Sequence, residues 1–289
     1  MTKTIVVISG KGGTGKTSIT ASMACLASGA VIADCDVDAP DLHLILKPEV
    51  IEEGRFMSGL IASIDRDLCT ECGECRRACA FGAIGEELSV DPIACEGCAV
   101  CDLVCPAGAV RLETADCGQW FLSKTRAGLM SHARLDPGKE NSGRLVSLVR
   151  TKAKEEAERT GSELIIVDGP PGIGCSVIAS MAGCDMALVV TEPTLSGVSD
   201  MQRVLDLALH FKIPAAVAIN KYDINVDIAG EIEAMLAERG VHFAGMVPYD
   251  TSFTEAQLAG KSVVEYGGDG AAPHVERLCK AVLKQLMNA

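Results

Sequence analysis

Short apolar runs alternate with helix-like segments along most of the chain. Five of these runs predict buried strands: Thr4–Ile8, Ala30–Ala33, Leu164–Val167, Met186–Val190 and Ala215–Ile219. The first leads into a glycine-rich turn and a helix, and each of the last three is followed by a polar turn and helix-like sequence. Because parallel strands need such crossover connections, the alternation predicts an α/β fold, a doubly wound and mostly parallel sheet with helices on both faces.

Two helices are indicated by the spacing of their apolar residues. The first has apolar positions at helical spacing with charges between them: Leu145, Val146, Val149, Ala153 and Ala157. The second, near the carboxyl end, has an amphipathic pattern: Val275, Leu278, Val282, Leu283 and Leu286. Its polar face is only weakly basic, so we expect this helix to pack against the sheet and expect no stable membrane insertion.

Residues 64–110 interrupt this alternation of strands and helices with an internal repeat of period 26. Ile64-Asp65 matches Val90-Asp91, and four cysteines recur at matching positions. A unit this short cannot bury a hydrophobic core of its own. We therefore predict one discontinuous α/β domain, residues 1–60 and 112–289, interrupted by an inserted module at 61–111 that something other than apolar packing holds together.

Composition narrows the class of protein. Apolar residues make up 48% of the chain and aromatic residues 3%, so the core is aliphatic, which suits a doubly wound sheet. The formal net charge of −13 argues against nucleic acid and anionic lipid as partners. The first apolar run, Ile5–Ile8, is too short for a signal peptide core or a membrane span. We therefore expect a cytoplasmic protein.

The 14 cysteines point to a reducing compartment, where clustered cysteines hold metal more often than they form disulfides. Eight of them form two runs with the spacing of bacterial ferredoxins: Cys69, Cys72, Cys75 and Cys79, then Cys95, Cys98, Cys101 and Cys105. Three thiolates of each run reach one [4Fe-4S] cluster and the fourth reaches the other. The spacing therefore predicts one cluster on Cys69, Cys72, Cys75 and Cys105, and a second on Cys95, Cys98, Cys101 and Cys79.

The inserted module is accordingly expected to be a ferredoxin-like α+β unit with two [4Fe-4S] clusters. Zinc is one alternative, although zinc sites favour separated pairs of ligands, and disulfides are another. Ala80 follows Cys79 where Pro106 follows Cys105. That difference loosens a turn and removes no ligand.

A phosphate-binding loop follows the first strand. Gly10-Lys-Gly-Gly-Thr-Gly-Lys-Thr17 satisfies the P-loop pattern and precedes a helix. Backbone N–H groups of such a loop surround phosphate, Lys16 is expected on the β- and γ-phosphates, and Thr17 on Mg²⁺. The alternative is a chance glycine-rich turn. The expected nucleotide ligands in this segment are Gly10, Lys11, Gly12, Gly13, Thr14, Gly15, Lys16, Thr17 and Ser18.

The second lysine in the loop, Lys11, is the deviant form of the motif and resembles the MinD/Mrp/ParA superfamily of P-loop ATPases, with the nitrogenase iron protein as a more distant relative. The resemblance implies that Lys11 crosses a dimer interface to the partner's nucleotide, and that Lys11, Lys16 and Asp36 act in catalysis. It further implies ATP with Mg²⁺, and a homodimer or a heterodimer with a paralogous ATPase. A solvated loop lysine is the alternative for Lys11.

Other segments fit the same superfamily. Asp36, in Asp34-Cys-Asp36, matches its switch I aspartate, and Asp168, at the end of an apolar run, resembles its Walker B aspartate beside Mg²⁺. Gly172 would offer an amide to the γ-phosphate. The remaining resemblances place Asn220 and Lys221 at adenine and Pro248 and Asp250 in a late loop near the base.

Two alternatives stay open at this stage. Asn220-Lys-Tyr-Asp223 also fits the guanine-reading signature of GTPases, so GTP competes with ATP. Cys175 matches the region of a cluster-bridging cysteine in the nitrogenase iron protein, but its only candidate companion, Cys117, is badly spaced, and packing as a small residue is favoured.

The leading functional hypothesis is a nucleotide-driven redox protein, in which ATP changes the shape of a dimer and gates electron transfer through the two clusters to a partner protein. The rival is an assembly or carrier ATPase for iron–sulfur clusters or metal centres. Eight complete ligands favour electron transfer, because a carrier must release its cluster. A positioning ATPase with structural clusters is the third hypothesis.

Overall fold

The computed structural model describes residues 2–139 and 142–288, and the chain divides into two units. The sheet unit comprises the residues up to Gly54, Trp120–Arg134 and those from Ser142 on. The cysteine unit comprises Arg55–Gln119 with Leu135–Asn141. It includes the span 61–111 that the repeat delimits and extends beyond it on both sides.

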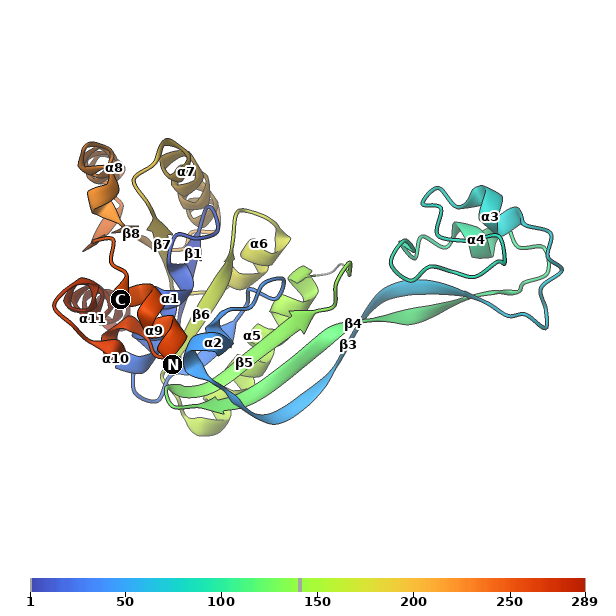
Figure 1. The fold of residues 1–289 in the computed structure, drawn as a ribbon, viewed down its shortest axis with the longest axis horizontal. Coiled ribbons are helices and arrows are strands. Elements are labelled where there is room, and N and C mark those ends of the chain that lie inside the picture. The colour runs from blue at the N-terminus through green and yellow to red at the C-terminus, as the bar shows by residue number, and fades with distance from the viewer. Residues whose placement is uncertain (1, 140–141, 289) are drawn as a thin grey trace. The chain divides into compact units, whose positions relative to one another are not determined.

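Within the described residues, nine strands form a sheet in the order β3-β4-β5-β2-β6-β1-β7-β8-β9 (Figure 1). They are β1 (Lys3–Ser9), β2 (Val31–Asp34), β3 (Glu49–Ile64), β4 (Val110–Thr125), β5 (Gly128–Leu135), β6 (Leu164–Pro171), β7 (Met186–Thr191), β8 (Ala215–Asn220) and β9 (His242–Val247). From β5 to β9, all neighbouring strands are parallel. The mostly parallel sheet and the five strands expected from the apolar runs are confirmed.

The helices of the sheet unit are α1 (Lys16–Leu26), α2 (Leu42–Leu46), α5 (Ser142–Thr160), α6 (Cys175–Met181), α7 (Leu195–His210), α8 (Val226–Glu238), α9 (Ser252–Ala259), α10 (Val263–Tyr266) and α11 (Ala271–Asn288), with a short 3₁₀ turn, η1, at Tyr222–Ile224. Those of the cysteine unit are α3 (Glu74–Ala78) and α4 (Val100–Leu103). Both helices expected from apolar spacing are present, as α5 and α11.

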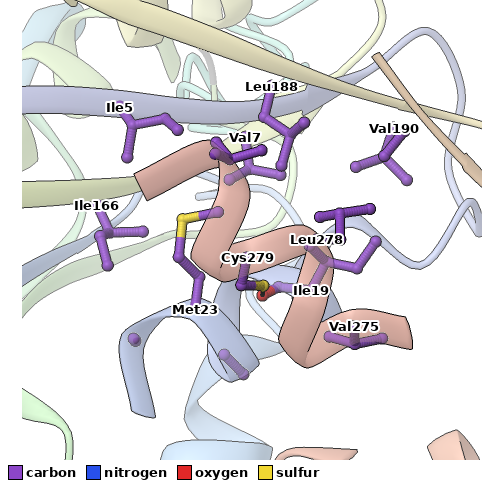
Figure 2. Packing of buried hydrophobic residues seen from close by; sticks show 14 of the residues in the cluster. Ile5, Val7, Ile19, Met23, Ile166, Leu188, Val190, Val275, Leu278 and Cys279 are labelled. Atoms are coloured by element: carbon purple, nitrogen blue, oxygen red, sulfur yellow. Dashed lines mark hydrogen bonds between the residues drawn. The ribbon is translucent and has the colours of Figure 1, made fainter. Parts of the chain in front are cut away.

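One face of the sheet is covered by α1 and α11. Side chains of a strand alternate between faces, so Ile5 and Val7 of β1 point to the same side, where they meet Ile19 of α1 and Leu278 of α11 (Figure 2). The apolar face of α11 is buried. This confirms that the carboxyl-terminal helix packs against the sheet.

The opposite face carries α6. A side chain at Gly169 of β6 would stand 2.5 Å from Ile8, 3.2 Å from Val6 and 3.1 Å from the Ser180 hydroxyl of α6. The strand therefore needs glycine at this position to let α6 approach. The helix α5 packs beside α6 and against β2 and β6.

The edge strand β3 and its neighbour β4 do not follow from the sequence pattern. All five residues of Glu49–Glu53 in β3 are exposed, and they mix charged with apolar side chains. With neither face buried there, the sequence carries no alternation of apolar and polar positions. The chain leaves the sheet unit within β3 and returns within β4.

Truncating a side chain between α1 and α11 tests this core. We predict that Leu278→Ala lowers the free energy of unfolding by about 2–5 kcal/mol, because Leu278 is 2% exposed and its loss leaves a cavity. The same change at Leu209, which is 72% exposed on α7, should cost less than about 0.5 kcal/mol. Urea denaturation followed by circular dichroism measures both, and equal midpoints for the two variants would contradict this description of the core.

Candidate nucleotide site and cysteine runs

The P-loop lies at the carboxyl edge of the sheet, between the central strand β1 and α1. Ligands of parallel α/β sheets bind at this edge. A cavity of about 520 Å³ opens there, within the usual range for small-molecule sites. The residues Gly12–Ser18 line it together with Asp36, Asp38, Pro170, Pro171 and Gln257.

Two glycines give the loop its shape. Gly15 has φ 88°, in the left-handed region, and a side chain there would meet the Asn220 amide nitrogen at 2.3 Å. A side chain at Gly10 would lie 2.6 Å from the backbone of Asp200. The first turn of α1 contains no acidic residue, and Gly15 caps it without a side-chain hydrogen bond. The free N–H groups of α1 therefore face the cavity edge with their partial positive charge.

Lys16 is buried among carboxylates. Its Nζ lies 3.1 Å from Asp168 Oδ1, 3.7 Å from Asp36 Oδ2 and 3.2 Å from the Thr17 hydroxyl. Burial alone would lower the pKa of Lys16, but the charges of Asp168 and Asp36 outweigh it and raise that pKa. Lys16 is therefore a permanent cation that neutralises this end of the sheet.

Asp34 and Asp168 lie side by side in the paired strands β2 and β6. Both are buried, and each has one carboxylate oxygen without a hydrogen-bond partner. Burial and the neighbouring Asp168 raise the pKa of Asp34 well above its usual range. Asp168 also accepts a 2.9 Å hydrogen bond from the Thr20 hydroxyl. Lys16 Nζ contacts both Asp168 and the Thr17 hydroxyl, so an acceptor oxygen of the kind that Mg²⁺ prefers lies in the same part of the site as Thr17.

Asp36 and Gly172 follow the two paired aspartates in the chain, and the segments around them are called switch I and switch II below. The backbone N–H of Asp36 donates to Asp34 Oδ1 at 3.2 Å. The N–H of Gly172 donates to the Ser9 carbonyl at 2.8 Å, so it is occupied by the protein itself here. Gly172 would have to exchange that bond to reach a phosphate.

Asn220 supports the P-loop from β8. Its side-chain nitrogen donates to the Thr14 carbonyl at 2.8 Å, and it is 2% exposed. Lys221 Nζ donates to the Gly13 carbonyl at 3.0 Å. Both residues expected near the base therefore contact the P-loop backbone.

The late loop is tied to its own helices. Asp250 accepts hydrogen bonds from the N–H groups of Ser252, at 2.8 Å, and Ala271, at 2.7 Å, which lowers its pKa. Asp223 accepts a 2.6 Å bond from the N–H of Tyr249, the residue after Pro248. The carboxylate that would read guanine is thus engaged by the backbone.

Lys11 is held within its own chain by Glu192. Lys11 Nζ lies 2.6 Å from Glu192 Oε1 and 3.4 Å from the Ser196 hydroxyl, while Lys221 Nζ lies 3.2 Å from Glu192 Oε2. Burial alone would raise the pKa of Glu192, but the two lysines lower it. The sequence did not single out Glu192 as a site residue. Its position directly after the apolar strand β7 is the signal that could have identified it, because such positions lie at the carboxyl edge of the sheet.

The two cysteine runs have matching backbones. Left-handed φ angles recur 26 residues apart: Glu71 (57°) with Gly97 (61°), Gly73 (73°) with Ala99 (67°), and Gly82 (64°) with Gly108 (59°). Cys75 and Cys101, the first cysteines within α3 and α4, are both buried. The internal repeat is therefore a structural repeat, and α3 and α4 pack together (Figure 1).

Cysteines from both runs come together. Burial raises the pKa of Cys75, and the neighbouring Cys105 and Cys69 act in the same direction. Cys79 joins Cys95, Cys98 and Cys101 in the lining of one cavity. Cys75 therefore lies near Cys69 of its own run and Cys105 of the other, and Cys79 shares a cavity with three cysteines of the second run.

The donor set suits a cluster better than a single ion. Among residues 2–139 and 142–288, no three Cys, His, Asp or Glu side chains lie close enough to hold one metal ion. A cubane binds each thiolate at a separate iron, so its ligands stand further apart than those of one ion. Backbone N–H groups also point at sulfur, from Ala109 to Cys105 at 3.3 Å and from Ala62 to Cys95 at 3.5 Å.

Cys175 and Cys117 lie in different units. Cys175 is exposed at the start of α6. Cys117 is buried in β4, and its thiol donates to the Ser58 carbonyl at 3.0 Å. The packing role expected for Cys175 therefore does not hold, because that side chain is in solvent.

Comparison with known proteins agrees with the fold. The model of the CobQ/CobB/MinD/ParA nucleotide binding domain matches residues 5–263. Over 226 residues the chain is 36% identical to uncharacterized protein MJ0578 of Methanocaldococcus jannaschii, covering 76% of this chain and 79% of that one. Over 136 residues it is 26% identical to the iron-sulfur cluster carrier protein of Pyrococcus furiosus, covering 43% and 46%.

Among solved structures, the septum site-determining protein MinD from Pyrococcus horikoshii, complexed with Mg-ADP, is similar with a TM-score of 0.60 and 19% identity, covering 99% of this chain and 97% of that chain. In the described part of the chain, no helix is both long and apolar enough to cross a membrane. With its P-loop between the central strand and α1, and with a family model that matches residues 5–263, the chain belongs to the CobQ/CobB/MinD/ParA family of nucleotide-binding domains.

Proposed function

We propose that this protein binds and hydrolyses ATP with Mg²⁺ in a dimer and uses that cycle to control electron transfer through two [4Fe-4S] clusters in the cysteine unit. The observation that carries the proposal is the pairing of a complete P-loop site with two ferredoxin-spaced cysteine runs, in which Cys79 of the first run lies beside cysteines of the second. Its partners would be a second ATPase subunit, identical or paralogous, and a redox protein in the cytoplasm.

The nucleotide half rests on charge exchange at Lys16. In the structure Lys16 is neutralised by Asp168 and Asp36. A triphosphate in the cavity would draw Lys16 toward its β- and γ-oxygens. The two carboxylates would then be free to hold the water shell of Mg²⁺ beside Thr17. Asp36, 3.7 Å from Lys16, would be left to orient the attacking water.

ATP is favoured over GTP because Asp223 already accepts the Tyr249 N–H. Guanine would have to share the Asp223 carboxylate with that backbone group, which occupies Oδ1. Asn220 holds the P-loop through Thr14. The P-loop match and the family membership apply equally to both nucleotides.

The cluster half rests on the cysteine sets. Each [4Fe-4S] cluster would supply one-electron redox chemistry when bound. The cysteines hold the two halves of the unit together, since Cys75 and Cys101 belong to the small core formed with Ala62, Ile84 and Val110. N–H groups directed at Cys95 and Cys105 would stabilise the added negative charge of a reduced state.

The rival function is that of an iron–sulfur carrier or assembly ATPase. It is supported by the name of the Pyrococcus furiosus relative, an iron-sulfur cluster carrier protein that is 26% identical over 43% of this chain. The aligned part of that protein covers less than half of its length. Eight protein ligands for two clusters still favour retention of the clusters over release.

The iron content tests the cluster half. Purified anaerobically, the chain should be brown and carry about eight irons with negligible zinc, because each of the two cysteine sets holds four irons. Inductively coupled plasma mass spectrometry with absorption spectroscopy measures this. Stoichiometric zinc without iron would refute the ferredoxin assignment.

The same preparation separates the two functions. Mixed with an apo-ferredoxin acceptor, it should keep its iron while it still reduces a one-electron dye after treatment with dithionite. Rapid transfer of iron to the acceptor, stimulated by ATP, would favour the carrier. A Cys98→Ala variant serves as the control with one impaired set.

Lys16 and Lys11 should have separable effects. Lys16→Ala should abolish nucleotide binding, because the phosphates would then meet backbone amides alone. Lys11→Ala should keep the affinity for ATP within about threefold of the wild type, a change worth less than 1 kcal/mol. It should no longer hydrolyse ATP to release phosphate, and it should no longer form dimers. Fluorescent nucleotide titration, phosphate assay and light scattering measure these effects, and equal loss of affinity in both variants would place Lys11 in the ordinary site.

Glu192 should oppose dimer formation, because it holds Lys11 within its own chain. Glu192→Gln removes the charge and keeps the shape. We expect it to lower the concentration needed for ATP-dependent dimerisation by about fivefold, since a partly exposed ion pair is worth roughly 1 kcal/mol. Glu231→Gln, on the exposed side of α8, is the matched control. Weaker dimers in Glu192→Gln would show that Glu192 supports the interface instead.

A further inference from the structure

The chain passes between the two units at four places, one of them after Arg134 at the end of β5. β3 leaves the sheet unit after Gly54, β4 enters it at Trp120, and the segment that ends at residue 141 leads directly into α5. α5 is therefore the helix that follows the last crossing. Any signal that moves α5 acts on the sheet unit at the point where the chain returns from the cysteine unit.

At one side α5 holds α6. Arg150 donates to the carbonyls of Ala179, at 2.9 Å, and Ala182, both at the carboxyl end of α6. At the other end of α6, Cys175 lies against Gly143 of α5, where an added side chain would come within 3.5 Å. α6 begins three residues after Gly172, so α5 contacts both ends of the helix that follows switch II.

At another side α5 holds the two strands. Lys152 Nζ lies 4.0 Å from the centre of the Trp120 ring in β4 and 3.6 Å from Glu52 Oε1 in β3. A cation over an indole is attracted by its electrons. Gly54 allows the ring to lie against β3, since a side chain there would be 2.7 Å from the indole. Lys152 thus joins Glu52 of β3 and Trp120 of β4, both of which lie close to the residues where these strands pass between the two units.

Arg150 and Lys152 are two residues apart on α5. Residues at this spacing do not share a helix face, because each step turns the helix by about 100°. One therefore contacts α6 while the other contacts β3 and β4. The helix lies between the element that follows the γ-phosphate loop and the strands that lead to the cysteine unit.

We propose that α5 is the element that transmits the nucleotide state to the β3–β4 strands, with Arg150 as its contact to α6 and Lys152 as its contact to Trp120 and Glu52. The proposal rests on the proposed function in taking the cysteine unit as the receiver of the signal. When the Gly172 N–H exchanges its hydrogen bond to the Ser9 carbonyl for one to a phosphate, α6 moves. The hydrogen bonds from Arg150 to α6 move α5 in turn, and Lys152 then changes its position over the Trp120 ring. Arg150 and Lys152 are positioning residues that touch neither nucleotide nor cysteine.

The chain contains one tryptophan, so its fluorescence reports Trp120 alone. In the full-length protein, purified anaerobically, MgATP should shift the emission of Trp120 relative to the nucleotide-free protein. Arg150→Met should abolish the shift while MgATP affinity stays within about twofold, well under 1 kcal/mol. Arg150→Lys, which keeps a donor, should restore part of it.

Lys152→Met tests the second contact through affinity, because it alters the surroundings of Trp120 directly. Coupling between sites is reciprocal, so the MgATP dissociation constant should differ about fivefold or more between the oxidised and the dithionite-reduced protein. In Lys152→Met this ratio should fall to about one. Lys154→Met is the matched control, since Lys154 is 73% exposed and contacts Glu158 of the same helix, and it should keep the wild-type ratio.

The outcomes decide the proposal separately from the function. An unchanged Trp120 emission in the wild type, or a full shift in a folded Arg150→Met, overturns it. If Arg150→Met does not fold, Arg150→Lys and Lys152→Met test the proposal instead. A Lys152→Met protein that keeps the wild-type ratio of MgATP dissociation constants between its oxidised and reduced forms overturns the proposal. If the protein holds no iron, the proposed function fails, and the Trp120 response to MgATP in Arg150→Met still supports or overturns the link through α5.

Discussion

The ion pair between Lys16 and Asp168 is the interaction on which the nucleotide site depends. Three carboxylates, those of Asp34, Asp36 and Asp168, gather at the carboxyl edge of the sheet, and burial raises the pKa of Asp34 and of Asp36. One lysine supplies the positive charge beside them, with its Nζ 3.1 Å from Asp168 and 3.7 Å from Asp36. A buried charge is tolerated only when it is paired. The same lysine therefore both pairs with these carboxylates and is the group that a triphosphate would recruit.

This arrangement explains why the loops around the site are connected to one another. Asn220 and Lys221 hold the P-loop carbonyls, Gly172 is bound to Ser9, and Lys11 is bound to Glu192. Of these groups, Gly172 and Lys11 are the ones that the proposed cycle would release. Binding of nucleotide would thus exchange internal bonds for bonds to phosphate, and the free energy of that exchange is available to shift α6 and, through Arg150, α5.

The cysteine unit poses the opposite physical problem. Its small core contains six buried residues, Ala62, Cys75, Ile84, Leu88, Cys101 and Val110, and two of these are cysteines. So little apolar surface cannot offset the entropy of ordering some seventy residues. Cross-links through metal clusters would supply what the core lacks. The matching backbone angles of the two runs show that the sequence repeat is also a repeat of backbone conformation.

The sequence by itself determined the parts that depend on neighbouring residues. The P-loop, the five apolar strands, the helices α5 and α11 and the repeat of the two cysteine runs all follow from short-range spacing, because backbone geometry repeats every two or 3.6 residues. The tertiary structure alone decided which charges meet. Glu192 reaches Lys11 and Lys152 reaches Trp120 only because strand order brings distant segments together, and a mixed-polarity edge such as β3 carries no periodic signal. Contacts of that kind depend on the order of the strands in the sheet, which no local pattern encodes.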